Sequence, residues 1–372
     1  MSNKPRLLIY APSWNKKRNL LFSRQLTEYF EVMILTSFRG DQNFFDLIKP
    51  AKIFQVKYRF KNKSNLSFSK KFKYFIKEYN PDYVLTVETF SFSSYKSAKL
   101  SQKFNYKPVV FSWQNRPSMP RFFFQKFIQK KVLNQARYLF AGTPSAKNYL
   151  LKKGVEKGRI FINPESGYDE KIFAIEGDNL RKEWGMETND IIVLYAGRFI
   201  KEKGIKQILS AAKKIESANP KIKFVFVGKG ELENKIKIFD SQNLYFRGFY
   251  DFTDMGKVFR SCNIFVYPSL SAQNRIRQFN YSVIEAQACG KPVIISNSGN
   301  LNNFVSDGVN GSTIEEGDEQ ILTEKILLWC DKLQIDRETI EHPASRFSGR
   351  NIALNYKKIL IDNDHLFLND WF

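Results

Sequence analysis

The sequence RQFNYSVIEAQACGKPVI, residues 277–294, holds the pattern that decides the fold. It leads from a polar loop into an apolar helical stretch and then into the run Pro292–Ile295, and it follows another apolar run, Ile264–Tyr267. A strand, a loop, a helix and a second strand in this order predict a βαβ unit with parallel strands. The helix is expected to begin around Phe279–Ser282, where the free N–H groups of the first turn and the helix dipole favour an anion.

Glu285 lies one to two turns inside this helix, on an otherwise apolar stretch, Val283–Ala288. A carboxylate in such a place costs free energy unless it is paired or bound. Its two oxygens match the two hydroxyl groups of a ribose. A salt bridge to a neighbouring lysine or arginine is the structural alternative.

The same rhythm of strand and helix fills the second half of the chain. Glycine turns follow three of its predicted strands, at Gly197, Gly228 and Gly248, and glycine lets a backbone approach a ligand closely. Arg198 and Lys203 stand beside the first turn as cations suited to a diphosphate. Each turn alone is weak evidence. The predicted strands are Ile191–Tyr195, Lys223–Val227, Leu244–Phe246, Ile264–Tyr267 and Pro292–Ile295, and the predicted helices are Lys206–Ser217, Leu232–Asp240, Asp254–Arg260, Val283–Ala288 and Glu319–Leu333.

The first half repeats this α/β alternation, and proline and glycine cluster between the halves at Asn163–Asp169. We therefore expect two Rossmann-like domains, 1–168 and 169–350, facing each other across a cleft, with a last helical segment, 351–372, that crosses back to the first domain. The strands predicted in the first half are Arg6–Ala11, Glu31–Thr36, Lys52–Val56, Tyr83–Val87, Pro108–Ser112 and Tyr138–Ala141, with amphipathic helices at Leu20–Tyr29 and Lys70–Tyr79.

Taken in order, these segments resemble the retaining nucleotide-sugar glycosyltransferases of family 4, which have the GT-B fold. The resemblance covers about half the chain, and the order and spacing of its segments are far more specific than any one of them. The matching segments are Val193–Arg198, Glu202–Gly204, Val225–Gly230, Phe246–Gly248, Tyr267–Ser269, the Glu285 segment, Ser298–Gly299 and Asp307–Gly311.

The resemblance implies a glycosyltransferase that holds a UDP-, GDP- or similar sugar nucleotide on its second domain. By this resemblance Arg198 and Lys203 contact the diphosphate and Glu285 holds the ribose. The backbone near Phe246–Phe249, with Gly248 and Phe249, meets the base. Gly197 and Gly228 line the site, and Phe279, Asn280 and Tyr281 add N–H contacts. It further implies retention of stereochemistry, no metal or other cofactor, and a departing phosphate that helps to activate the acceptor hydroxyl.

The sequence departs from the family at two places. The family has a glutamate eight positions before the ribose glutamate, where this chain has Arg277, and Asn280 replaces a common glycine. Our hypothesis is that Arg277 supplies a further cation to the diphosphate or to an acidic sugar. The first half also lacks the histidine of many relatives; Gln114 and Asn115 stand at that place and cannot act as a base. Glu88, at the end of the Tyr83–Val87 run, is the nearest alternative carboxylate, and a surface or ion-paired role is equally open.

Nearly all of the net charge of +22 belongs to the first half: residues 1–168 contain 32 lysines and arginines and 9 acidic residues. Aromatic residues lie among these cations in Lys57–Lys77 and Pro117–Phe140. This pattern is typical of a segment on an anionic membrane, of a site for a polyanionic glycan, or of an ordinary helix with one solvated basic face. The expected acceptor is accordingly lipid-linked, part of the cell envelope, or a polyanionic glycan.

Three widely spaced cysteines and the absence of a long apolar run predict a cytoplasmic protein, peripheral at most at the inner face of the membrane. Only two histidines are present, His342 and His365, and we expect no metal site. Two other functions stay open. Arg277 allows a catalytically inactive partner subunit, and the basic half allows a nucleic-acid-binding protein. The second half carries no positive excess and no nucleic-acid motif, so we expect no nucleic-acid partner.

Overall fold

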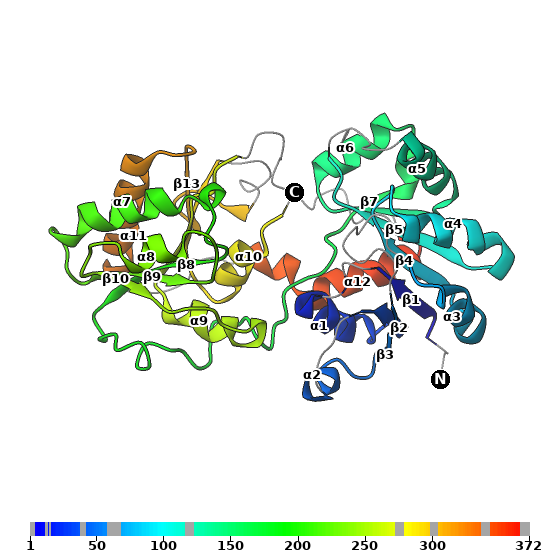
Figure 1. The fold of residues 1–372 in the computed structure, drawn as a ribbon, viewed down its shortest axis with the longest axis horizontal. Helices are drawn as coiled ribbons and strands as arrows, with labels where there is room; N and C mark the ends of the chain where they lie inside the picture. The colour runs from blue at the N-terminus through cyan, green and yellow to red at the C-terminus, as the bar shows by residue number, and fades with distance from the viewer. Residues whose placement is uncertain are drawn as a thin grey trace. The chain divides into compact units, whose positions relative to one another are not determined.

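The computed structural model describes residues 4–11, 14, 16–37, 42–57, 68–115, 123–271, 279–297, 304–335 and 343–364. The chain forms two compact units: unit 1 comprises Met1–Asp169 with Phe347–Phe372, and unit 2 comprises Glu170–Arg346 (Figure 1). Each unit is a parallel sheet covered by helices, as the alternating pattern predicts.

Unit 1 has a seven-stranded sheet in the order β3-β2-β1-β4-β5-β6-β7, and every pairing is parallel. Its strands are β1 (Arg6–Tyr10), β2 (Glu31–Thr36), β3 (Lys52–Gln55), β4 (Tyr83–Val87), β5 (Lys107–Ser112), β6 (Tyr138–Ala141) and β7 (Ile160–Ile162). Its helices are α1 (Lys17–Leu26), α2 (Gln42–Asp46), α3 (Phe72–Tyr79), α4 (Phe92–Phe104), α5 (Phe123–Gln135), α6 (Pro144–Lys152) and α12 (Gly349–Leu360).

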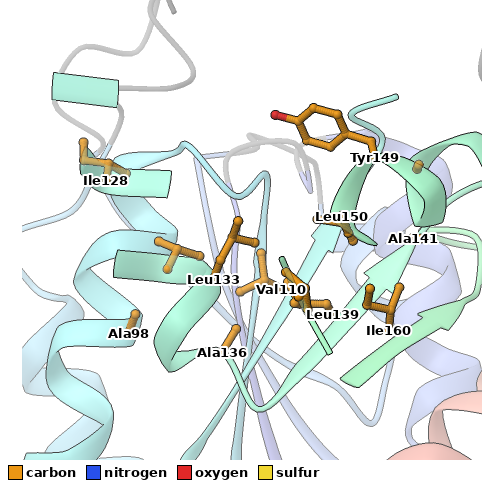
Figure 2. Packing of buried hydrophobic residues seen from close by; sticks show 13 residues of the cluster. Ala98, Val110, Ile128, Leu133, Ala136, Leu139, Ala141, Tyr149, Leu150 and Ile160 are labelled. Carbon is orange, nitrogen blue, oxygen red and sulfur yellow. The ribbon is translucent and has the colours of Figure 1, made fainter. Parts of the chain in front are cut away.

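One face of this sheet carries a core that α4, α5 and α6 complete over β5, β6 and β7 (Figure 2). Val110, Leu139 and Ile160 project from the strands toward Ala98 of α4 and Leu150 of α6. All five side chains are at most 4% exposed. Because parallel strands with both faces covered are apolar along their whole length, β5 and β6 read as continuous apolar runs in the sequence.

The opposite face is covered by α1 and α12. The Tyr356 ring of α12 packs against Phe22 of α1 and Phe140 of β6, with centroid distances of 6.0 and 4.8 Å. The Tyr83 hydroxyl of β4 donates to the Leu360 carbonyl at the end of α12. The core of unit 1 therefore includes a helix that begins more than 180 residues after the last strand of the sheet, β7.

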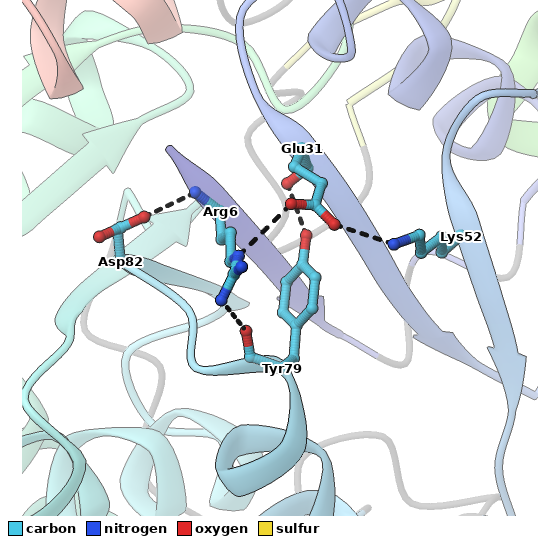
Figure 3. Close-up of polar contacts among 5 residues, drawn as sticks. All are labelled: Arg6, Glu31, Lys52, Tyr79 and Asp82. Atoms are coloured by element: carbon cyan, nitrogen blue, oxygen red, sulfur yellow. Dashed lines mark hydrogen bonds and ion pairs between the residues drawn. The ribbon is translucent and has the colours of Figure 1, made fainter. Parts of the chain in front are cut away.

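Charged residues at the amino ends of β1, β2 and β3 pair with one another (Figure 3). Glu31 accepts from Lys52 at 2.9 Å and from Arg6 at 3.4 Å. The hydrogen bond from Lys52 holds the pKa of Glu31 below its usual value, and the charge of Arg6 acts in the same direction. Arg6 also donates to the Tyr79 carbonyl, and its N–H donates to Asp82. These pairs join the first three strands at the amino end of the sheet, opposite the carboxyl end at which parallel sheets bind ligands.

Unit 2 has a six-stranded parallel sheet in the order β10-β9-β8-β11-β12-β13. In the described part of unit 2, α7 and α11 pack together on one face and α9 and α10 lie on the other (Figure 1). The strands are β8 (Ile191–Ala196), β9 (Ile222–Val227), β10 (Leu244–Phe246), β11 (Ile264–Tyr267), β12 (Val293–Ser296) and β13 (Gly311–Ile314), and the helices are α7 (Ile205–Glu216), α8 (Glu233–Lys237), α9 (Met255–Ser261), α10 (Tyr281–Ala288) and α11 (Glu319–Ile335).

In both sheets the order of strands reverses beside the first strand, between β1 and β4 and between β8 and β11. At such a reversal the loops after two adjacent strands diverge, and ligands of parallel sheets bind there, beyond the carboxyl ends. The expected α/β fold of two Rossmann-like domains is confirmed. That the domains face each other across a cleft stays a prediction.

Two short strands, β7 and β13, have no counterpart in the sequence pattern, and several predicted helices are displaced. α1 begins three residues before the predicted Leu20 and ends at Leu26 rather than Tyr29. α8 covers only Glu233–Lys237 of the predicted Leu232–Asp240.

Candidate functional site

The three glycine turns of unit 2 lie side by side at the carboxyl end of its sheet. The Gly197 N–H donates to the Val227 carbonyl at 3.0 Å, and the Gly228 N–H donates to the Gly248 carbonyl at 2.7 Å. Two residues beyond the first of these bonds, the Phe199 N–H donates to the Lys229 carbonyl at 3.0 Å. The turns after β8, β9 and β10 therefore form one continuous backbone surface.

Two glycines allow these loops to approach. Gly228 has φ of 142°, and a Cβ atom there would lie 1.9 Å from the Gly197 carbonyl oxygen. Gly204 has φ of 69°, and its Cβ would lie 1.9 Å from the Pro268 carbonyl oxygen. Both φ values lie in the region that side chains other than glycine rarely adopt. Gly204 thereby brings the turn at Lys201–Lys203 against the segment that follows β11.

Lys203 is held at the reversal between β8 and β11. Its ammonium donates to the Tyr267 hydroxyl and lies 4.5 Å from the centroid of that ring. Tyr267 stacks on Tyr195 of β8 at 6.3 Å, and the Tyr195 hydroxyl donates to the Arg198 carbonyl at 2.8 Å. The Arg198 side chain is exposed. Two cations thus stand at the end of the sheet where this kind of fold binds its ligand, and their contact with a diphosphate stays a prediction.

The predicted anion site at the start of α10 is built as follows. α10 begins at Tyr281, and the Asn280 side chain caps it by accepting from the Ser282 N–H at 3.1 Å. The Asn280 Nδ2 atom is buried and has no hydrogen-bond partner among the described residues. Phe279 packs against Tyr281 and Phe304, with centroids 4.7 and 5.2 Å apart. Asn280 therefore acts as a helix cap here, a role that a glycine fills less well.

Glu285 lies in the second turn of α10 and is 2% exposed, in agreement with the apolar character of that helix. Because α10 follows β11, its first turns begin near the carboxyl end of the sheet, where the three glycine turns also lie. Arg277 lies outside the described residues, so its expected contact with the donor stays a prediction.

Phe249 is 63% exposed, and Lys229 lies over its ring at 4.5 Å from the centroid. Gly248, with φ of 69° and open space where a Cβ would stand, turns the chain just before it. An exposed aromatic ring beside a cation at the edge of the glycine surface suits a base that stacks on it. The cation Lys229 is an addition to the residues that the sequence singles out.

A second polar group lies at the carboxyl end of the unit 1 sheet. Glu88 directly follows β4, and its carboxylate accepts from the Ser112 hydroxyl at 2.9 Å and from the Trp113 N–H at 3.2 Å. Burial raises the pKa of Glu88 to about 7, although these two hydrogen bonds oppose the rise and the charge of Glu165 adds to it. Glu88 is therefore a partly buried carboxylate held by neutral donors, and among the described residues no lysine or arginine pairs with it.

Glu165 is the residue that sequence reasoning missed. It is 7% exposed, and its carboxylate accepts from the Trp113 indole N–H at 3.1 Å and from the Asn19 amide at 3.2 Å. In the sequence it lies in the Pro-Glu-Ser-Gly stretch near the expected boundary, where a charged residue predicts only an exposed turn. Its burial depends on its contact with Asn19 of α1, and no local sequence pattern reveals that contact.

Gln114 and Asn115 also lie at this end of the sheet, as expected. Gln114 accepts from Gln129 of α5 at 2.9 Å, and Gln129 donates to the Thr89 hydroxyl at 2.7 Å. Asn115 lines a cavity of about 430 Å³ together with four residues of α6 and the residue that follows the helix: Ser145, Asn148, Tyr149, Lys152 and Lys153. The described residues contain no group of three acidic, histidine or cysteine side chains that could hold a metal ion.

The second unit is similar to a known family of proteins. The family described as Glycosyl transferases group 1 matches residues 176–342. The chain is 27% identical to a Staphylococcus aureus capsular polysaccharide biosynthesis glycosyltransferase, over 60% of this chain and 59% of that protein. It is 26% identical to a Campylobacter jejuni N,N'-diacetylbacillosaminyl-diphospho-undecaprenol alpha-1,3-N-acetylgalactosaminyltransferase, again over 60% and 59%. The matches thus span about six tenths of these curated relatives.

Solved structures share the fold over nearly the whole chain. A glycosyltransferase from Rickettsia africae has a TM-score of 0.75 at 19% identity, covering 97% of this chain and 100% of that one. Anabaena HepE in complex with UDP-glucose has a TM-score of 0.69 at 17% identity, covering 96% and 99%. A Listeria monocytogenes protein described as a UDP-N-acetylglucosamine 2-epimerase has a TM-score of 0.67 at 14% identity, covering 98% of each chain. Transferases and an epimerase share this architecture, so the fold alone does not decide the reaction.

Proposed function

We propose that the chain, whose residues 176–342 match the group 1 glycosyl transferases and which has the GT-B fold, transfers a sugar from a nucleoside diphosphate sugar to a glycan or lipid-linked acceptor. The donor would lie on unit 2, with its diphosphate at Arg198 and Lys203 and its ribose at Glu285. Its base would lie near Gly248 and Phe249.

The observation that carries the proposal is the placement of Lys203 against Tyr267, beside the exposed Arg198, at the strand reversal of unit 2. A departing nucleoside diphosphate gains negative charge as its bond to the sugar breaks. Two cations at this place, Lys203 and Arg198, would stabilise that charge more in the transition state than before it. The order of the motifs and the family match support the same assignment.

We further propose retention of the anomeric configuration and a reaction that needs no divalent metal. The two curated relatives act, by their names, in capsular polysaccharide biosynthesis and on a diphospho-undecaprenol substrate. For this chain we accordingly propose an envelope polysaccharide or lipid-linked saccharide as acceptor. The anomeric signal of the product in a proton NMR spectrum tests retention, and activity in excess EDTA tests the metal.

A thermal-shift titration with UDP, GDP and ADP tests donor binding. We expect one nucleoside diphosphate to raise the Tm of the wild-type protein, and Lys203→Ala and Arg198→Ala each to weaken its binding roughly 10- to 100-fold, as the loss of a charge-assisted hydrogen bond predicts. Lys201→Ala is the matched control, because Lys201 is an exposed lysine of the same turn. No shift with any nucleoside diphosphate would exclude the proposed function.

A second assay separates an active enzyme from the two alternatives. Release of nucleoside diphosphate from the preferred sugar nucleotide is expected for a transferase. Binding without release, in the presence of lipid-linked and polysaccharide acceptors, would favour an inactive partner subunit. Salt-sensitive binding of single-stranded oligonucleotides, with no response to nucleotides, would favour a nucleic-acid-binding protein.

Arg277 has a test of its own. If it binds the diphosphate or an acidic sugar, Arg277→Glu will lower turnover with the preferred donor and shift the preference among neutral and acidic sugar nucleotides. Unchanged turnover and unchanged donor choice would exclude this role. Arg277→Gln, which removes the charge without reversing it, is the companion variant.

A further inference from the structure

We infer that the cavity beside α6 of unit 1 binds an acidic sugar residue of the acceptor, and that Lys152 and Lys153 select its carboxylate or phosphate group. This inference rests on the proposed function, because it takes the occupant of the cavity to be part of the acceptor. It adds one requirement that the proposed function does not contain, namely that the acceptor carries a negative charge. All the residues that carry the inference belong to unit 1.

The cavity lies at the carboxyl end of the unit 1 sheet. Asn115 comes shortly after β5, which ends at Ser112, and α6 begins at Pro144, shortly after β6 ends at Ala141. Parallel sheets bind their ligands beyond this end. The volume of about 430 Å³ falls within the roughly 300–1,000 Å³ of cavities that bind small molecules. One sugar residue with an acidic group therefore suits this cavity in size.

One face of α6 forms a wall of the cavity. Ser145, Asn148, Tyr149 and Lys152 all line it, and residues spaced by three, four and seven positions lie on the same side of a helix. Lys147 belongs to the same helix but is not among the residues that line the cavity. The wall thus offers a hydroxyl, an amide and an ammonium group, which bind sugar hydroxyls and anions.

Tyr149 gives this wall a fixed surface. Its side chain is 4% exposed, and its hydroxyl donates to Gln129 of α5 at 3.3 Å. Gln129 in turn donates to Gln114 at 2.9 Å and to Thr89 at 2.7 Å. Burial raises the pKa of Tyr149, and the charge of Glu88 adds to this rise, although the hydrogen bond to Gln129 opposes it. The Tyr149 hydroxyl therefore stays neutral and adds no negative charge to the cavity.

The charged side chains that line the cavity are both positive. Lys152 and Lys153 are exposed, and none of the lining residues is acidic. The Lys153 ammonium lies 5.4 Å from the centroid of the Tyr149 ring, which keeps it beside the wall. Two neighbouring ammonium groups favour a carboxylate or phosphate over a neutral ligand, and they bind it more tightly at low ionic strength.

Asn115 provides an observation that is independent of the lysines. Its Nδ2 atom is buried and has no hydrogen-bond partner among the described residues. A buried donor without an acceptor costs free energy, and a ligand that brings an oxygen atom removes this cost. Carboxylate, phosphate and hydroxyl oxygens all accept hydrogen bonds. The cavity therefore combines an unsatisfied donor with two cations, as a ligand rich in oxygen and negative charge requires.

The neutral groups of the cavity favour an acidic sugar over a free inorganic anion. An inorganic anion needs the lysines alone and fills little of the volume. The Asn148 amide is exposed on the same wall, and the Ser145 hydroxyl lies 3.0 Å from the Thr143 hydroxyl at the start of α6. Hydroxyls and amides of this kind bind the hydroxyl groups of a sugar ring.

The test is isothermal titration calorimetry of the whole chain with glucuronate, glucose 6-phosphate, glucose and inorganic phosphate. Saturating nucleoside diphosphate is present, so that the proposed donor site on unit 2 does not bind the phosphate probes. We expect one of the two acidic sugars to bind at least roughly tenfold more tightly than glucose and inorganic phosphate, and its binding to weaken with salt. Preference for glucuronate indicates a uronic acid in the acceptor, and preference for glucose 6-phosphate indicates a sugar phosphate.

Variants of the cavity locate the binding. Lys152→Ala and Lys153→Ala are each expected to raise the Kd of the acidic sugar roughly 2- to 5-fold, as the loss of one exposed charge partner predicts. Asn115→Asp keeps the size of the side chain but replaces the donor with a negative charge, so it should raise this Kd more than either lysine variant. Lys147→Ala is the matched control, because it removes a lysine of the same helix from outside the cavity.

The outcomes separate this inference from the proposed function. Equal affinity for glucose and the acidic sugars, inorganic phosphate that binds as tightly as they do, or a Kd that no cavity variant changes would overturn the inference alone. Absence of nucleotide binding in the wild-type protein would overturn the proposed function, and titrations without nucleotide still decide whether the cavity binds an acidic sugar. The cavity variants should keep the wild-type thermal shift with the nucleoside diphosphate, and circular dichroism establishes that each is folded.

Discussion

At the scale of single residues, Glu88 makes the stability of the protein depend on pH. Its folded pKa of about 7 lies above its ordinary value of 4.5, so the folded state holds the proton more tightly than the unfolded state. The stability is fully present below pH 4.5 and is lost as the pH rises through 7. The shift corresponds to on the order of 3 kcal/mol.

We therefore expect Glu88→Gln to lose less stability than the wild-type protein between pH 5 and pH 8. Urea unfolding followed by circular dichroism at several pH values measures the difference between the two proteins. Glu156→Gln removes an exposed glutamate of the same unit, so it serves as the control and should follow the wild type. Parallel curves for Glu88→Gln and wild type would contradict the raised pKa.

Two glycines with the same φ angle allow the cost of backbone strain to be measured separately from the cost of a steric clash. Gly204 and Gly248 both have φ of 69°, but a Cβ meets the Pro268 carbonyl oxygen at 1.9 Å only in the first case, and the second has open space. We expect Gly248→Ala to lower the free energy of unfolding by about 1 kcal/mol and Gly204→Ala by clearly more. Urea unfolding of both variants measures this. Equal losses would mean that the turn at Lys201–Lys203 moves away from β11 without cost.

The residues proposed for the donor site lie in local motifs that are visible in the sequence, whereas their partners in the folded protein could not be predicted. A glycine after a strand and a lysine six residues further on are visible in the sequence. The ring of Tyr267 beneath Lys203 comes from a strand more than 60 residues away. The burial of Glu165 could not be predicted for the same reason, because its partners Asn19 and Trp113 are both distant in sequence.

At the scale of elements, one aromatic ring of α12 packs between two elements of unit 1. Tyr356 packs between Phe22 and Phe140 and is fully buried. We expect Tyr356→Ala to lower the free energy of unfolding by roughly 3–5 kcal/mol, since it leaves a cavity between two elements. Tyr356→Phe keeps the ring and should cost much less. The measurement is urea unfolding, and equal stability of the two variants would show that α12 is not part of this core.

The elements that sequence reasoning missed are those with the weakest local signal. β7 has three residues and follows a turn, and β13 reads Gly-Ser-Thr-Ile, of which only the last is large and apolar. Both lie at an edge of their sheets and take their strand conformation from the neighbouring strand. The strands at the centre of each sheet are continuous apolar runs, and these could be predicted to within about one residue.

At the scale of the molecule, the positive charge and the exposed aromatic rings of unit 1 predict binding to an anionic membrane. Phe127 is 54% exposed and lies 5.8 Å from the Lys131 ammonium, and Tyr74 is 60% exposed. No helix among the described residues is long and apolar enough to cross a membrane. We expect co-sedimentation with phosphatidylglycerol vesicles that weakens in 0.5 M salt, because salt screens surface charges.

The controls for this prediction distinguish a membrane surface from a polyanion site. Phe127→Ala should reduce vesicle binding, whereas Ile238→Ala, which removes an exposed apolar side chain of unit 2, should not. Vesicles of phosphatidylcholine alone should bind little. Equal binding by wild type and Phe127→Ala, with strong binding of a soluble anionic polysaccharide, would favour the glycan as the partner of this charge.

The packing of α12 on unit 1 has a consequence for the order in which the two units fold during synthesis. Unit 2 is an insertion within unit 1: the chain leaves unit 1 after Asp169 and returns at Phe347, and at this point Tyr168 and Ser348 pair as a parallel bridge. During synthesis all of unit 2 emerges from the ribosome before α12 does, so unit 2 can complete its core first. Until α12 arrives, the face of the first sheet that it will cover stays open. The first domain in the sequence is thus the last to finish folding.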